Sequence, residues 1–215
     1  MKPTKQYLLP DIVEQIRNPD SCWNGLLALK NVTSIENLDT YHHYCNDSFW
    51  VVRWAIIEKL GDFASIESLD ILFEKLNDSD DHVKKTTQKA IHKCVKNHIE
   101  HILMRCTSSC PTTKHYCHMY LSKYALININ KIEQFIYTAS WLDANTLLHL
   151  LFNVFKDKIE STLIKATKQP FTQKNAIMML AIIGSKRSVP HLISLYETPA
   201  LKRHIIEALK MEEAT

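Results

Sequence analysis

The chain has 215 residues, of which 46% are hydrophobic, and its formal net charge is +3. This composition supports a buried core and excludes a disordered chain, and the small charge lacks the strong basic excess of dedicated nucleic-acid binders. Only 3 glycines occur, which argues against folds built on many tight turns or phosphate-binding loops and favours helices joined by short polar loops.

The N-terminal segment, residues 1–10, carries lysines but no apolar core followed by a cleavage site, so we expect no secretion signal. No stretch approaches the roughly 18 consecutive apolar residues that a membrane helix needs. The 6 cysteines are therefore expected to be reduced thiols in a cytoplasmic protein.

Polar, helix-breaking clusters recur along the chain at nearly constant intervals. They begin at positions 18, 46, 77, 108, 140, 169 and 198, so that successive clusters are separated by about 30 residues. Between the clusters, hydrophobic residues recur at helical spacing, as in Val52, Ala55, Ile56 and Leu60. Each period therefore predicts two short amphipathic helices, and the pairs are expected at 7–31, 34–60, 65–96, 98–127, 129–155, 158–183 and 188–210.

The predicted pairs also superimpose on one another. Moving Leu60 back by one period gives Leu29, and moving it forward by about four periods gives Ile183; the same forward shift carries Gly61 onto Gly184. A lone helix pair cannot cover its own apolar stripe, so we expect neighbouring pairs to cover each other. The chain is predicted to be all-α and to form a single domain, residues 1–215, although the middle part, 97–170, fits the period only with shifts of a residue or two.

Three segments of the chain resemble parts of HEAT repeats. Residues 8–16 before Asn18-Pro19-Asp20, and residues 69–78, are similar to the first helix and turn of that family, and residues 52–61 are similar to its second helix. The family's ladder of turn aspartate and helix cation has counterparts in Asp47 with Arg53 and in Asp78 with Lys84. The resemblance implies an alpha-alpha superhelix of about seven HEAT-like helix pairs, whose second helices line a concave binding surface.

Three residues of the segment 49–54 are candidate anchors for a protein partner. Trp50, Arg53 and Trp54 share a helical stripe that differs from the predicted core stripe, and aromatic and arginine side chains supply much of the energy of protein interfaces. The alternative is that the tryptophans fill the junction between helix pairs. One period later, Lys84, Lys85 and Lys89 would add a cationic sector that attracts an acidic partner, although solvated lysines on a helix face explain them equally well.

Potential soft metal ligands are concentrated in residues 94–118. No Cys-x-x-Cys pair accompanies them, and cysteines in helical repeats are usually small buried hydrophobes. We therefore expect no metal and no other cofactor. The candidates, should a metal bind, are Cys94, His98, His101, Cys106, Cys110 and Cys117.

The sequence contains no nucleophile elbow, no zinc-protease motif and no phosphate-binding glycine loop. One enzyme class remains as an alternative, because Trp141 and Asp143 resemble a segment of the HEAT-like alkylpurine DNA glycosylases. The arginines that should grip a DNA backbone are few and scattered, and an aspartate at this position is also an ordinary partner of a helix N-terminus.

The sequence thus predicts a non-enzymatic, protein-binding scaffold, adaptor, regulator or inhibitor. Its partner is expected to be a protein with an acidic surface. A DNA glycosylase or DNA-binding protein is the alternative.

Overall fold

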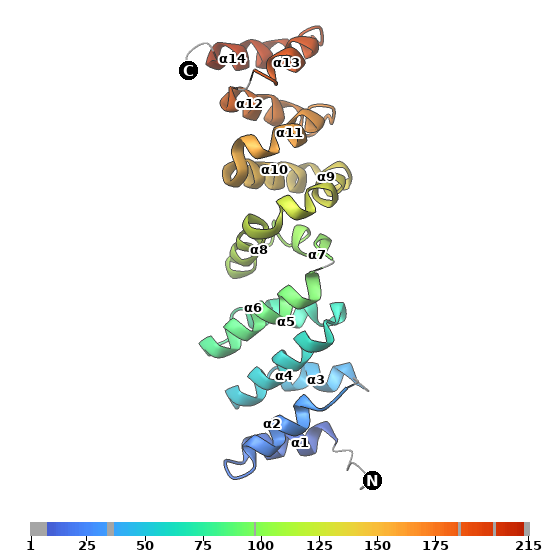
Figure 1. Ribbon diagram of the computed structural model, residues 1–215, viewed down its shortest axis with the longest axis vertical. Helices are drawn as coiled ribbons and strands as arrows, with labels where there is room; N and C mark the ends of the chain where they lie inside the picture. Colours follow the sequence, from blue (N-terminus) through green and yellow to red (C-terminus); the bar gives the residue numbers. More distant parts are fainter. Residues whose placement is uncertain (1–7, 34–36, 97, 185, 200, 213–215) are drawn as a thin grey trace. The chain divides into compact units, whose positions relative to one another are not determined.

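In the computed structural model, the described residues are 8–33, 37–96, 98–184, 186–199 and 201–212, and they form helices and turns without any β-strand (Figure 1). The prediction of an all-α fold is confirmed. None of the helices in these ranges combines the length and apolarity that crossing a bilayer requires.

The chain divides into two compact units, Met1–His98 and Ile99–Thr215, which are described separately. The expectation of a single domain over 1–215 stays a prediction. The elements of unit 1 are α1 (Leu9–Arg17), α2 (Cys22–Lys30), α3 (Leu38–Tyr44), α4 (Trp50–Phe63), η1 (Ile66–Ser68), α5 (Leu69–Lys75) and α6 (Asp81–Val95).

Unit 2 continues the alternation of helices along the chain. Its elements are α7 (Glu100–Leu103), α8 (Pro111–Tyr124), η2 (Leu126–Asn128), α9 (Ile129–Thr138), α10 (Trp141–Phe155), η3 (Lys156–Ile159), α11 (Glu160–Ala166), α12 (Gln173–Ile183), α13 (Val189–Leu195) and α14 (Lys202–Glu212). In both units an odd-numbered helix and the even-numbered helix that follows it form a pair, and the pairs fall at the predicted positions. We call the even-numbered member the second helix of its pair.

The predicted polar clusters are the turns inside these pairs. Four of them share one local structure, in which a side-chain oxygen accepts a hydrogen bond from the backbone N–H two residues later and closes the turn. The accepting residues are Asn18, Asp47, Asp78 and Ser108, with N···O distances of 3.0, 2.9, 3.0 and 3.2 Å. Since a helix cannot continue through such a turn, these four clusters determine where α2, α4, α6 and α8 begin.

Side chains one period apart hydrogen-bond from one pair to the next. In unit 1, Lys59 Nζ donates to the carbonyl oxygen of Lys30 at 2.9 Å, and Lys93 Nζ lies 2.7 Å from Asp62 Oδ1. In unit 2, Asn175 Nδ2 donates to Asn145 Oδ1 at 2.6 Å. The repeat length read from the sequence is therefore also the offset between neighbours in space, within each unit.

The two glycines that superimpose in the sequence have different structural roles. Gly184 ends α12 in the left-handed conformation, with φ of 61°. Gly61 lies inside α4 and touches α6, where a Cβ would lie 2.8 Å from both the Cα and the Cβ of Ala90. The left-handed residue at the end of α4 is Ala64, with φ of 49°.

We expect Gly61→Ala to destabilise unit 1 by about 1–3 kcal/mol, because the new methyl group would press on the backbone of α6 and force the two second helices apart. Thermal and urea unfolding followed by circular dichroism measures this loss.

Ala64→Gly, at the end of the same helix, is the matched control. Glycine relieves the left-handed strain of this position at a smaller cost in chain entropy, so this variant should gain about 0.5–1 kcal/mol. Equal destabilisation by both variants would show that helix propensity, and not close packing, decides the outcome.

Candidate functional site

The surface predicted to bind a partner lies on the second helices of unit 1. Trp54 of α4 is partly exposed, and the positions one period before and after it are Trp23 of α2 and Lys85 of α6, both exposed. Trp23 has 71% of its surface accessible to solvent. These three residues occupy equivalent positions of three successive second helices. We call them the aromatic column, after the two tryptophans, although its third member is Lys85.

Trp50 lies one turn before Trp54 and is 40% exposed. Its ring stacks on the imidazole of His82 of α6, with 5.7 Å between the ring centroids and an interplanar angle of 29°. Phe49, just before α4, is also exposed. Three large aromatic side chains near the start of α4 and α2 therefore remain accessible after the helices have packed.

Trp23 was not among the candidates drawn from the sequence. The signal was present, because the shift of one period that relates Leu60 to Leu29 also relates Trp54 to Trp23.

The structure does not place Arg53 on this surface. Its guanidinium is buried and binds Asp78 through two hydrogen bonds, from Nε to Oδ2 at 2.8 Å and from Nη2 to Oδ1 at 2.7 Å. Nη1 donates to the carbonyl oxygen of Asp47 at 2.9 Å. Arg53 therefore joins two turns of the fold, and its assignment as a partner anchor is corrected: its donors are already used inside unit 1.

The pairs of turn aspartate and cation differ from those that the sequence pattern predicted. The carboxylate of Asp47 pairs with Arg17, and the carboxylate of Asp78 pairs with Arg53. Each aspartate thus binds an arginine that precedes it in the chain, whereas the sequence pattern predicted a cation that follows it. Ile57, which lies one helical turn after Arg53, is also fully buried.

The lysines of α6 differ in their surroundings. Lys84 is partly exposed and forms an ion pair with Asp81, with Nζ 2.8 Å from Oδ1; this hydrogen bond raises the pKa of Lys84. Lys85 and Lys89 are exposed. Lys85 and Lys89 are therefore more accessible than Lys84, and a role of the three lysines in attracting a partner stays a prediction.

Asp143, the candidate for the glycosylase alternative, has a structural role at the start of α10. Its Oδ1 accepts a hydrogen bond from the hydroxyl of Thr107 at 2.6 Å and its Oδ2 from the hydroxyl of Ser140 at 2.7 Å, and these bonds lower the pKa of the carboxyl group. Ser140 in turn accepts from the backbone N–H of Asp143 at 3.2 Å, which caps the helix. The Trp141 side chain lies outside the described residues.

The Cys/His candidates are divided between the units. Cys94 and His98 belong to unit 1, and His101, Cys106, Cys110 and Cys117 belong to unit 2. In the described part of the chain, no three His, Cys, Asp or Glu side chains converge as ligands of a metal ion.

Three of these cysteines are buried thiols. Burial raises the pKa of Cys94 to about 11, and a hydrogen bond with Cys117, together with burial, raises the pKa of Cys106. Cys106 Sγ also donates to the carbonyl oxygen of Ile102 at 3.3 Å. Cys94 and Cys106 therefore stay protonated, and all three cysteines pack as small core side chains.

Unit 2 has a groove of about 640 Å³ across the second helices α8, α10 and α12. Most of its lining side chains are polar by number, but apolar atoms form the larger part of the exposed lining surface. The lining residues are Lys114, His118, Ser122, Leu142, Asn145, Thr146, His149, Leu150, Asn153, Val154 and Asn175. Apart from His118, which belongs to the segment 94–118 of potential metal ligands, none of them is a candidate from the sequence.

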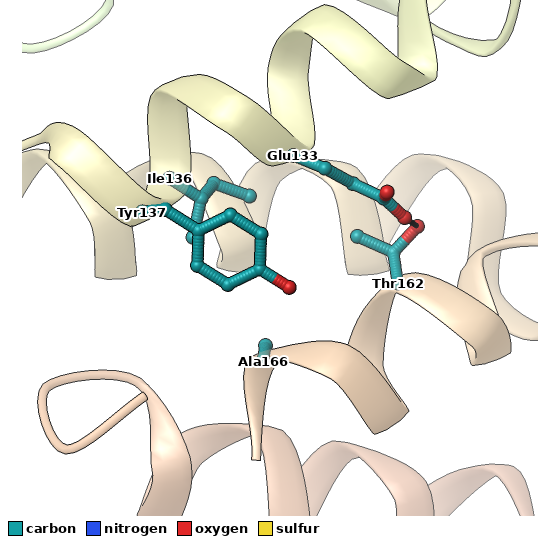
Figure 2. Close-up of a pocket in the computed structure, with 5 residues that line it drawn as sticks. All are labelled: Glu133, Ile136, Tyr137, Thr162 and Ala166. Carbon is teal, nitrogen blue, oxygen red and sulfur yellow. Dashed lines mark hydrogen bonds between the residues drawn. The ribbon is translucent and has the colours of Figure 1, made fainter. Parts of the chain in front are cut away.

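A second hollow, between the first helices α9 and α11, is too small to be a binding site. Figure 2 shows Tyr137 and Ile136 facing Ala166 across it, with Glu133 hydrogen-bonded to Thr162. It has no room for a water-sized molecule. Glu133 accepts from the Thr162 hydroxyl at 2.9 Å and from Lys165 Nζ at 2.6 Å, so its carboxylate joins two helix pairs.

Comparisons with known proteins do not assign the chain to a family. No family model matches it, and no curated protein matches it. Among solved structures, human deoxyhypusine hydroxylase in complex with glycerol is similar at 9% identity and a TM-score of 0.39, over 96% of each chain. An engineered protein is similar at 14% identity and a TM-score of 0.33, over 84% of this chain and 98% of its own. At these scores neither neighbour supports an inference about function.

We expect Asp78→Asn to lower the free energy of unfolding by about 3 kcal/mol, because it leaves the buried Arg53 cation without its counter-charge. Burial alone would raise the pKa of Asp78, but hydrogen bonds from Arg53 and from the Asp80 N–H outweigh it, and the net pKa is lowered. Since the unfolded value is about 3.9, this stability is fully present above about pH 4 and is lost as the pH falls through the lower, folded-state pKa.

Unfolding titrations from pH 7 to pH 2 test this assignment. The wild-type chain should lose more stability in acid than Asp78→Asn does, and Asp81→Asn, which removes the exposed partner of Lys84, should lose far less at neutral pH. Similar losses for the two variants would contradict a structural role for the buried pair.

Proposed function

We propose that the chain is a non-enzymatic, protein-binding scaffold of HEAT-like repeats, acting as an adaptor, regulator or inhibitor in the cytoplasm. Unit 1 would hold its partner on the outward surface of α2, α4 and α6. The observation that carries this proposal is the exposure of large aromatic side chains on these helices, above all of Trp23.

Aromatic side chains are the groups that most often anchor protein interfaces, and tryptophan is the most enriched of them. Trp23 contributes little to the core, since 71% of its surface remains exposed. Trp54 occupies the equivalent position on α4, so a partner segment crossing the two second helices would meet both indoles. Packing within unit 1 accounts for Arg53 and Ile57 but not for Trp23.

The charge of α6 supports a partner with an acidic surface. Lys85 and Lys89 are exposed one period after the tryptophans. Exposed cations beside apolar anchors mainly accelerate and orient association, and their contribution is screened by salt. An acidic partner would therefore be attracted by α6 and held by α2 and α4.

The repeat pattern and the cysteines support the other parts of the proposal. The side-chain-closed turns recur in four successive periods and resemble one another in structure, as expected of HEAT-like pairs. All 6 cysteines are free thiols, which accords with a reducing compartment.

We expect Trp23→Ala to weaken binding of the partner about 30-fold while changing the stability of the chain little, because an exposed anchor acts in the complex and not in the fold. Trp54→Ala should weaken binding comparably, and Lys85→Glu should slow association and reduce its salt dependence.

Affinity capture from the source organism, run in parallel with wild type and Trp23→Ala, identifies proteins whose capture depends on this residue, and calorimetry with the purified partner then measures Kd. Ile127→Ala is the control, since Ile127 is an 83% exposed apolar residue of unit 2. Equal capture by wild type and Trp23→Ala, or a several-kcal/mol loss of stability in Trp23→Ala, would reject the aromatic column as the binding surface.

A further inference from the structure

The connections between successive helix pairs of unit 2 lie along one edge of that unit. Hydrogen bonds hold the starts of its second helices side by side: Thr107, before α8, bonds to Asp143 of α10 at 2.6 Å, and Asn175 of α12 bonds to Asn145 of α10 at 2.6 Å. The ends of the same helices therefore lie at the opposite edge, where the chain passes to the next pair. We call the three connecting segments the connection edge. They are residues 123–128, 154–159 and 182–187, described except for residue 185.

The connection edge is rich in exposed cations. In the described part of its three segments, Asp157 is the one exposed carboxylate. No ion pair between described residues involves Lys156, Lys158 or Lys186, so the charge of these lysines is available to an external anion. The exposed cations of the edge are Lys123, Lys156, Lys158, Lys186 and Arg187.

Lys156 occupies a backbone position that glycine adopts more easily. Its φ of 45° is in the left-handed region, and with a ψ of −115° it ends α10. A residue with a Cβ is strained in this region, because the Cβ crowds the backbone. The local structure therefore gives no reason for a lysine at this position, whereas a role of its ammonium group in binding supplies one.

Exposed aliphatic side chains accompany the cations. Leu126 and Ile127 of η2 are 40% and 83% exposed, and Ile182, in the last turn of α12, is 57% exposed. The connection between α4 and α5 in unit 1 differs, because its exposed charged residues are the carboxylates Asp62 and Glu67 and it has no large exposed apolar side chain. Joining two helix pairs thus does not by itself produce a cationic and aliphatic edge.

Cations beside exposed aliphatic side chains match the interface of an anionic lipid bilayer. Anionic headgroups attract lysine and arginine, and aliphatic side chains enter the boundary between headgroups and acyl chains. A nucleic acid would satisfy the cations only, since its bases stack on aromatic side chains and the described part of the edge exposes none. An acidic protein surface would likewise leave Ile127 against charged groups. A bilayer can also reach all three segments at once, which extend over about 16–20 Å if neighbouring helices lie about 8–10 Å apart.

We propose that the connection edge of unit 2 binds the surface of a membrane rich in anionic lipids. The cations of the edge pair with the headgroups, and Ile127 enters the interface beside them. Binding is peripheral and reversible, because it depends on a few surface charges and short aliphatic side chains. The inference goes beyond the proposed function and does not depend on the aromatic column.

Co-sedimentation of the full chain with sucrose-loaded vesicles tests the proposal. Vesicles of phosphatidylcholine with about one-third phosphatidylserine should bind the chain, vesicles of phosphatidylcholine alone should not, and salt should weaken the binding. Lys156→Glu combined with Lys158→Glu should weaken it about 25-fold or more, since each cation near an anionic surface contributes about fivefold. Lys156→Gly should weaken it about fivefold without lowering the thermal stability, because glycine relieves the left-handed backbone.

Two matched controls place the same chemical changes at the other edge of unit 2. Lys168→Glu combined with Lys174→Glu alters the net charge equally, and these exposed lysines lie near the start of α12, so vesicle binding should change by about twofold at most. Ile127→Asp should weaken binding about 10-fold. Leu142→Asp, in the first turn of α10 and also exposed, should leave it unchanged.

Three results would overturn the proposal. These are equal sedimentation with the two kinds of vesicle, equal weakening by the two lysine pairs, and binding of labelled duplex DNA or polyglutamate through Lys156 and Lys158 without binding of vesicles. Trp23→Ala should leave vesicle binding intact, and Ile127→Ala should weaken it while sparing the protein partner of unit 1. Failure here and failure of the proposed function are therefore distinguishable.

Discussion

Within each unit of this chain, a helix pair has more apolar surface than its two short helices can cover, and a neighbouring pair of the same unit covers it. Helices of 7 to 15 residues such as α5 and α6 are too short to be stable alone. They are stabilised by neighbours one period away, and that offset recurs in the hydrogen bonds from Lys59 to Lys30 and from Asn175 to Asn145. Neighbouring second helices must also approach each other closely, as the contact of Gly61 in α4 with Ala90 in α6 shows.

This constraint explains why the sequence predicts the helices well and the site less well. Turn positions depend on local chemistry: Asn18, Asp47 and Asp78 each close a turn with the backbone two residues later, and this preference is visible in the residue types alone. Exposure depends on which neighbour covers a position. A helical wheel places Arg53 and Ile57 with the tryptophans, but Asp78 and the core of unit 1 bury both.

The residues that line the groove of unit 2 could not be predicted for the same reason, because exposure depends on the neighbouring helices. Its residues come from three second helices, and Asn145 and Asn175 become neighbours only because they lie one period apart. In residues 97–170 the period was uncertain by one or two positions, which on a helix turns a side chain by about 100° or more. The helices of this region could therefore be predicted, whereas the face that each presents could not. For Trp23 the period was known, and a systematic shift along the chain would have found it.

Side chains whose position is explained by packing and hydrogen bonding within the fold can be separated from those whose position is not. Arg53 and Glu133 look like functional residues by type, yet each carries a set of hydrogen bonds that joins neighbouring pairs. Trp23 is the opposite case, because it is large, apolar and exposed, and its truncation removes little from the core. His118 Nε2 is likewise shielded from solvent and has no hydrogen-bond partner among the described residues. Groups whose placement costs stability, or adds none, are the ones for which binding supplies the missing physical reason.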